Sequence, residues 1–97
     1  MKFRITRRAD ADIDDIWNYI AEQNPGAADR VEAKLHAAMH MLAEQPGMGH
    51  SRPDSDPSYR FWRVHSFLIV YRLQVETIVV MRVVHGRRNL RNLFNIV

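Results

Sequence analysis

Cysteine is absent from the 97 residues of this chain. Disulfide bonds and metal sites built on thiolates are therefore excluded, and a chain without disulfides suits the cytoplasm. The sequence also lacks an apolar run of about 20 residues, the length that a membrane-spanning helix needs. Residues 1–8 alternate and are charged, unlike the apolar core of a signal peptide. We therefore expect a cytoplasmic protein that has no membrane partner.

The composition is typical of one small globular domain. Hydrophobic residues make up 46% of the chain and charged residues 26%, which excludes a disordered protein. We expect a single domain over residues 1–97. A domain of this size buries a modest share of its surface, and no disulfide or thiolate metal site supports it. The sequence therefore indicates a protein stabilised by a binding partner.

Acidic and basic residues are concentrated in different halves of the chain. Residues 9–45 contain eight acidic side chains and two basic ones, whereas residues 57–97 contain seven arginines and one glutamate. Arginine, with its forked set of donors, suits contacts to phosphate or carboxylate groups. The second half is therefore predicted to face nucleic acid or an acidic protein.

Two amphipathic helices are predicted after a short first strand at residues 2–6. Thr6 can cap the first helix, whose apolar stripe consists of Ile13, Ile16, Trp17 and Ile20. Asn24 and Pro25 mark the start of a second helix, and Pro46 and Gly47 mark its end. Because the link between the two helices is so short, they should form an antiparallel hairpin.

The rest of the chain is predicted to be a loop followed by three strands. Residues 47–58 are polar and rich in proline, aspartate and serine, and the strand-like runs cover residues 59–65, 67–73 and 77–85. Their short links require antiparallel pairing. The fold class is therefore α+β, with an N-terminal strand and a two-helix hairpin packed on a largely antiparallel sheet that contains three C-terminal strands.

An ordered set of short motifs resembles the ParE toxins of the ParE/RelE toxin–antitoxin superfamily along nearly the whole chain. The most telling motif is Arg82-Val83-Val84-His85-Gly86-Arg87-Arg88 at the end of the last strand. The others are Ala9-Asp10, Asp15-Ile16-Trp17, Tyr19-Ile20, Asn24-Pro25, Ala27-Ala28, Leu42-Ala43, Pro46-Gly47-Met48-Gly49 and Ile69-Val70-Tyr71-Arg72.

This resemblance implies a fold, a partner and a target. The fold is a helical hairpin on a twisted sheet, the partner is an antitoxin whose C-terminal segment wraps the toxin, and the target of the ParE branch is DNA gyrase. It also implies a bacterial toxin–antitoxin hetero-oligomer, a role in plasmid stabilisation, and action by binding, without a cofactor or a reaction of its own.

The related RelE branch leaves an enzymatic alternative open. RelE toxins cut messenger RNA on the ribosome, a reaction that needs a base, an acid and cations for the phosphate. The candidates here are His85 for proton transfer and Arg60, Arg63 and Arg82 as cations. That branch commonly uses a C-terminal tyrosine, which residues 89–97 lack. The sequence therefore favours the gyrase inhibitor over the ribonuclease.

Two sets of residues are predicted to form binding surfaces. Arg87, Arg88 and Arg91 form a basic cluster that is assigned to the target, with a solvated chain end as the alternative. The antitoxin is assigned to the sheet, because Phe61 and Trp62 point to opposite faces and one of them should lie away from the helices. The full antitoxin set is Phe61, Trp62, Arg63, Tyr71 and Arg82; the alternative is that the apolar tail, residues 90–97, covers this face.

No metal site is predicted. His36 and His40 lie one helical turn apart, but alanines occupy the positions between them where a zinc protease motif carries glutamate. The carboxylates of Asp10, Asp12, Asp14 and Asp15 diverge around one helix, so they are predicted to be a solvated acidic face near the positive end of the helix dipole.

Overall fold

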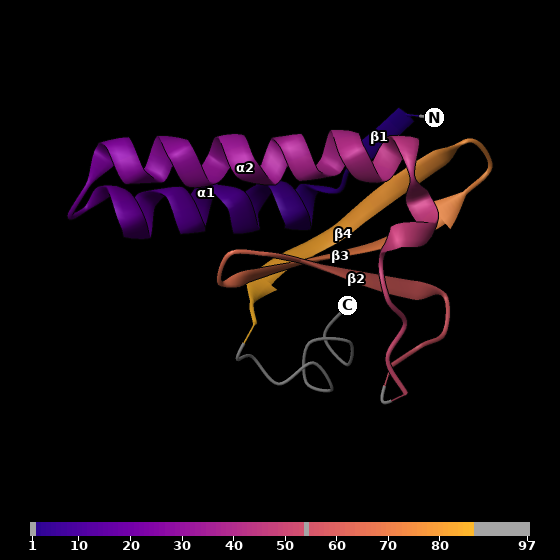
Figure 1. Ribbon diagram of the computed structural model, residues 1–97. Coiled ribbons are helices and arrows are strands. Elements are labelled where there is room, and N and C mark those ends of the chain that lie inside the picture. The colour runs from indigo at the N-terminus through magenta and orange to yellow at the C-terminus, as the bar shows by residue number, and fades with distance from the viewer. Residues whose placement is uncertain (1, 54, 87–97) are drawn as a thin grey trace.

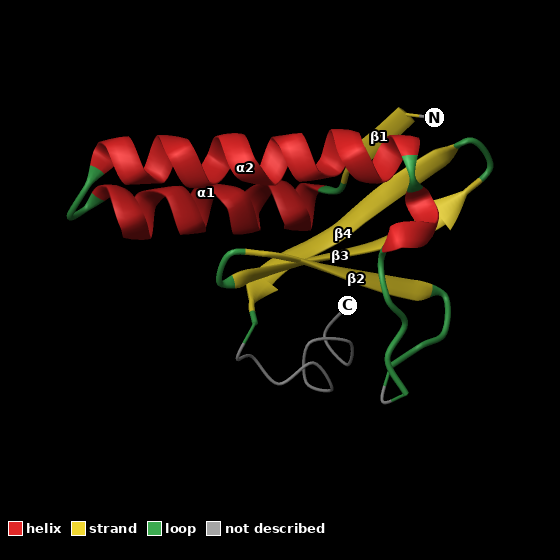
Figure 2. Ribbon diagram, viewed as in Figure 1, coloured by secondary structure: helices red, strands yellow, loops and turns green. Residues whose placement is uncertain are grey.

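The computed structural model describes residues 2–53 and 55–86, and its elements within these residues follow the expected order (Figure 1). They are β1 (Lys2–Ile5), α1 (Arg7–Ala21), α2 (Pro25–Glu44), a short 3-10 helix η1 (Pro46–Met48), β2 (Tyr59–Val64), β3 (Phe67–Gln74) and β4 (Thr77–His85). Figure 2 shows the two helices together on one face of the sheet. The predicted α+β class and the helical hairpin are confirmed.

Both helices begin at the residues that the sequence indicated as caps. The Thr6 hydroxyl accepts a hydrogen bond from the Ala9 N–H at 3.1 Å, and the Asn24 side-chain oxygen accepts one from the Ala27 N–H at 3.0 Å. Pro25 occupies the first turn of α2, where its missing N–H has no cost. Capping of this kind is worth about 1 kcal/mol for each helix.

The four strands form one mixed sheet in the order β1-β4-β3-β2. The last three strands pair antiparallel as predicted, whereas β1 pairs parallel to β4, with Lys2 opposite Thr77 and Ile5 opposite Val80. Parallel pairing is possible because the helical hairpin carries the chain back across the sheet. The first strand therefore lies beside the last one.

A β-bulge changes the direction of side chains halfway along β4. Val70 is opposite Arg82, but the next residue of β3, Tyr71, is opposite Val80, so Met81 has no partner in the register. Strand residues normally alternate between faces, yet Val80 and Val83 both lie in the core between sheet and helices. The bulge therefore sets the direction of Arg82, which follows the unpaired residue.

The main hydrophobic core lies between the helices and the sheet. Its buried residues are Ala9, Ile13, Leu35, Met39, Leu42, Ile69, Tyr71, Ile78, Val80 and Val83. A smaller buried cluster, formed by Phe61, Leu68, Val70 and Val84, lies on the opposite face of the sheet. Within residues 2–53 and 55–86, no helix combines the length and the apolar character needed to cross a membrane.

Tyr71 fastens the segment after α2 to the sheet. Its hydroxyl accepts a hydrogen bond from the Gly49 N–H at 2.9 Å and donates one to the Pro46 carbonyl at 2.8 Å. Arg60 adds a hydrogen bond to the Gly49 carbonyl at 2.9 Å. Burial is the main influence on the Tyr71 phenol and raises its pKa, so the hydroxyl stays neutral and remains able to donate.

Candidate functional site

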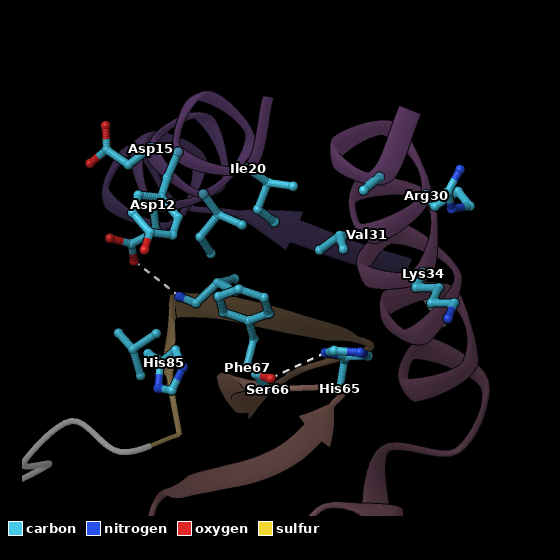
Figure 3. A pocket seen from close by; sticks show the side chains of 15 residues that line it. Asp12, Asp15, Ile20, Arg30, Val31, Lys34, His65, Ser66, Phe67 and His85 are labelled. Carbon is cyan, nitrogen blue, oxygen red and sulfur yellow. Dashed lines mark hydrogen bonds between the residues drawn. The ribbon is translucent and has the colours of Figure 1, made fainter. Parts of the chain in front are cut away.

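A groove of about 690 Å³ opens where the helical hairpin meets the end of the sheet (Figure 3). We call it the hairpin groove. Side chains from α1 and α2 form two of its walls, and the β2–β3 turn and the end of β4 form the rest. The residues that line it are Asp12, Asp15, Ile16, Tyr19, Ile20, Ala27, Arg30, Val31, Lys34, His65, Ser66, Phe67, Val83, Val84 and His85.

Apolar side chains occupy the middle of the hairpin groove. Ile20 of α1 and Val31 of α2 face the space above Phe67, which rises from the start of β3 (Figure 3). All three are only partly buried in this structure. Ile16 and Val31 also flank the main core, so the groove continues the core toward solvent. An open apolar surface of this kind is typical of a binding site for another chain.

Charged and polar side chains surround this apolar centre. Arg30 and Lys34 lie on α2, Asp15 lies on α1, and His65 and His85 lie at the sheet end; all five are exposed. His85 packs edge-on against Phe67 with 5.8 Å between ring centroids, and His65 Nδ1 is 3.1 Å from the Ser66 hydroxyl. An apolar centre with a polar rim is the usual anatomy of a protein–protein interface.

A buried ion pair supports the α1 side of the groove. Arg82 Nε and Nη2 donate to the two carboxylate oxygens of Asp12 at 2.7 and 3.1 Å, and the Val83 N–H donates to Asp12 at 3.0 Å. Only 1% of the Arg82 side chain is exposed, and its Nη1 atom has no hydrogen-bond partner in the part of the chain that the structure describes. Asp12 therefore fixes α1 to β4.

The position of Asp12 corrects one prediction. The sequence placed Asp12 on a solvated acidic face together with Asp10, Asp14 and Asp15, and the last three are indeed exposed. The prediction is wrong for Asp12, because α1 packs this turn against β4, where the bulge brings Arg82 within reach of the carboxylate.

The four residues considered for RNA cleavage do not converge. Arg82 is buried and paired with Asp12. Arg60 and Arg63 are three positions apart on β2 and so point to opposite faces; Arg60 binds the Gly49 carbonyl, and Arg63 binds the His65 carbonyl at 3.2 Å. His85 alone lies in the hairpin groove. The geometry does not assemble a shared phosphate site from these residues.

The residues assigned to the antitoxin are separated as well. Phe61, Tyr71 and Arg82 are buried, so they offer no surface to a partner in this conformation, and this corrects their assignment as an exposed contact set. Trp62 is half-buried on the helix side and stacks on His50 with 6.5 Å between ring centroids. Arg63 is exposed. Trp62 and Arg63 alone remain accessible.

Other residues singled out in the sequence have different outcomes. Arg87, Arg88 and Arg91, and the apolar tail, lie outside the described residues.

Among the residues that the structure describes, no three potential metal-binding side chains gather, and the His40 ring packs edge-on against Phe3 at 4.8 Å. Periodicity did not reveal the hairpin groove, although its apolar residues Ile16 and Ile20 were part of the predicted stripe of the first helix.

Comparisons with known proteins agree with one another. The chain matches the family described as "ParE toxin of type II toxin-antitoxin system, parDE" over residues 3–90. It is 40% identical to Toxin ParE1 of Caulobacter vibrioides over 92 residues, which are 92% of this chain and 93% of that protein. Toxin ParE3 of the same organism is 29% identical over 86 residues, covering 88% of this chain and 86% of that protein. A solved structure, "Chromosomal ParDE TA system from P. aeruginosa", superposes with a TM-score of 0.75 at 24% identity, covering 88% of this chain and 95% of that one, which supports the fold.

Proposed function

The chain belongs to the family of ParE toxins of type II toxin–antitoxin systems, and we propose that it inhibits DNA gyrase by binding and is neutralised by a cognate antitoxin. The two proteins would form a hetero-oligomer in the cytoplasm. The toxin engages gyrase and either traps its DNA cleavage complex or blocks supercoiling, so that replication stalls. No cofactor and no reaction by the toxin itself enter this mechanism.

The arrangement of the described residues supports binding over chemistry. The hairpin groove has an apolar centre and a charged rim, as a protein-binding surface does. By contrast, among the residues considered for a ribonuclease, Arg82 is buried in an ion pair, and Arg60 and Arg63 point to opposite faces of β2. Cleavage of a phosphodiester requires these groups to surround one phosphate. A surface that contacts proteins therefore fits this geometry better.

The basic segment after β4 is the proposed gyrase contact. Arg87, Arg88 and Arg91 place three guanidinium groups within five positions and without an acidic residue among them. Guanidinium groups bind carboxylate and phosphate oxygens through paired hydrogen bonds, so the segment suits both gyrase and the DNA that gyrase holds.

A paired assay tests the target. Purified toxin is expected to inhibit gyrase supercoiling of plasmid DNA and to leave messenger RNA on stalled ribosomes intact. The double variant Arg87→Glu, Arg88→Glu should lose this inhibition, because two attractive charges become repulsive. Lys2→Glu, Arg4→Glu is a control with the same change in net charge at exposed residues of the opposite chain end, and it should inhibit gyrase normally.

Two results would contradict this proposal. Cleavage of RNA with unaffected gyrase would assign the protein to the ribonuclease branch and make His85 the first candidate for proton transfer. Full inhibition by a folded Arg87→Glu, Arg88→Glu variant would remove the basic segment from the gyrase contact. Circular dichroism of each variant shows whether the fold is intact.

The hairpin groove is the proposed antitoxin site, in place of the sheet surface that the sequence indicated. Its apolar centre suits the apolar stripe of an amphipathic helix, and Arg30 and Lys34 suit acidic residues beside that stripe. An antitoxin helix in this position would cover Ile20, Val31 and Phe67, and the added apolar burial would stabilise the small domain.

Charge reversal on the groove rim separates the two candidate antitoxin sites. Arg30→Glu, Lys34→Glu is expected to weaken antitoxin binding by roughly tenfold or more while leaving the fold intact, since both residues are exposed. Arg63→Glu, on the outer face of β2, should change the affinity little. Isothermal titration with the cognate antitoxin measures both. A large loss of antitoxin affinity with Arg63→Glu, and no loss with Arg30→Glu, Lys34→Glu, would instead assign the antitoxin site to the outer face of the sheet.

A further inference from the structure

The outer edge of β1 has backbone groups that none of the other three described strands uses. β1 is at one end of the strand order. The Lys2 N–H donates to the Glu76 carbonyl, just before β4, at 3.3 Å, and the Thr6 N–H, just after β1, donates to the Val80 carbonyl of β4 at 3.1 Å. In a parallel pair, every second residue turns its N–H and C=O toward the neighbour. The N–H and C=O groups of Phe3 and Ile5 therefore point away from β4, at the rim of the molecule where Figure 1 places β1.

Four exposed cations flank this edge. Residues 2–8 contain Lys2, Arg4, Arg7 and Arg8 and no acidic residue. None of the four has an ion pair within residues 2–53 and 55–86. Phe3 and Ile5 pack toward the helix-side core, so Lys2 and Arg4 point to the other face of the sheet by strand alternation.

The placement of Arg7 and Arg8 is unfavourable for the toxin alone. Both lie in the first turn of α1, where the positive end of the helix dipole disfavours cations. Asp10 is the one acidic residue of this turn, and no described residue forms an ion pair with Arg7 or Arg8. An anionic partner beside the turn would offset the unfavourable effect of the dipole.

The opposite end of the edge has apolar surface. Val75, in the β3–β4 turn, is 92% exposed, and Leu73 is exposed nearby on β3. Val75 lines a shallow hollow of about 540 Å³ together with Lys2, Glu76 and Thr77. A chain that runs along β1 would reach this hollow and could bury an apolar side chain in it.

We propose that the outer edge of β1 receives an extended acidic segment of the antitoxin as a fifth strand. Alternate residues of that segment carry carboxylates facing Lys2 and Arg4, and the residues between them lie on the apolar, helix side. A second copy of β1 is disfavoured, because it would bring Lys2 and Arg4 against like charges. The assignment to the antitoxin rests on the proposed function, and the site is separate from the hairpin groove.

The test uses a synthetic peptide, acetyl-(Glu-Val)₃-amide, and NMR of the isotope-labelled full chain. Peptide addition should shift the Phe3 and Ile5 amide signals and slow their hydrogen exchange, as expected for new strand pairing. Lys2→Glu, Arg4→Glu should weaken binding by roughly tenfold, and a peptide with lysine in place of glutamate should not bind. The groove variant Arg30→Glu, Lys34→Glu is the matched control and should bind the peptide normally.

Three outcomes would overturn this inference. The first is no binding at millimolar peptide, and the second is peptide-induced shifts at the groove with Phe3 and Ile5 unchanged. The third is protection of the two amides that rises with toxin concentration alone, which would assign the edge to a second copy. The peptide assay contains neither gyrase nor antitoxin, so its failure leaves the proposed function standing.

Discussion

Replacing Asp12 with alanine is expected to lower the free energy of unfolding by about 3–5 kcal/mol, the usual effect of removing one partner from a buried ion pair. Arg82 would keep its charge in a site where 1% of the side chain is exposed, and it would lose both of its hydrogen bonds. The Val83 N–H would lose its acceptor as well. Urea denaturation of the purified chain measures the loss.

Neighbouring carboxylates of the same helix provide the control for this prediction. Asp14→Ala and Asp15→Ala remove the same group from exposed positions, so each should change the stability by no more than about 0.5 kcal/mol. Combining Asp12→Ala with Arg82→Met should recover part of the loss, because no buried charge remains. If Asp12→Ala were as mild as Asp14→Ala, the ion pair would not fix α1 to β4.

Gly49→Ala is expected to destabilise the protein by about 1–3 kcal/mol, the range for overpacking a filled site. A Cβ atom on Gly49 would lie 2.2 Å from the Tyr71 hydroxyl oxygen and 2.7 Å from the nearest ring carbon. Tyr71 is fully buried and cannot move aside freely, so either the ring or the segment after α2 must shift. The shift would also weaken the hydrogen bonds from Gly49 and to Pro46.

Gly47, in the same segment, provides the control that distinguishes a steric clash from a general effect of replacing glycine with alanine. A Cβ atom on Gly47 would meet no atom within 4 Å, so Gly47→Ala should leave the melting temperature nearly unchanged. Adding Tyr71→Phe to Gly49→Ala should not restore the stability, because the ring carbon 2.7 Å from the new Cβ remains and the hydrogen bonds of the hydroxyl to Gly49 and Pro46 are lost. Equal melting temperatures for Gly49→Ala and Gly47→Ala would contradict this explanation.

The sequence predicted those features that depend on neighbouring residues. Thr6, Asn24 and Pro25 indicated the helix starts, and the spacing of Ile13, Ile16 and Ile20 indicated the buried side of α1, because capping and periodicity act within a few positions. The strands needed only alternation and short turns. Their predicted limits differ from the structure by about one residue, within the usual uncertainty of such boundaries.

The features that the sequence did not reveal depend on residues far apart in the chain. Arg82 was considered for surface roles because its partner Asp12 is 70 positions away and an unpaired residue, Met81, sets its direction. Tyr71 was considered for the antitoxin because its hydroxyl partners, Pro46 and Gly49, lie in a loop whose course the pattern could not predict. The hairpin groove combines two helices, a turn and a strand end, so it exists only in the assembled fold.

The pairing of β1 with β4 also determines when the sheet can be completed during synthesis of the chain. The first strand emerges from the ribosome early, but its neighbour in the sheet is the last of the four described strands to be made. Until β4 is available, the helical hairpin has no complete sheet to cover, and its apolar stripe stays open to chaperones and proteases. The pairing of β1 with β4 closes a loop of most of the described chain, and this delays the final assembly, since contacts distant in sequence form slowly. The described sheet, and with it the hairpin groove, is therefore complete only after β4 has been synthesised.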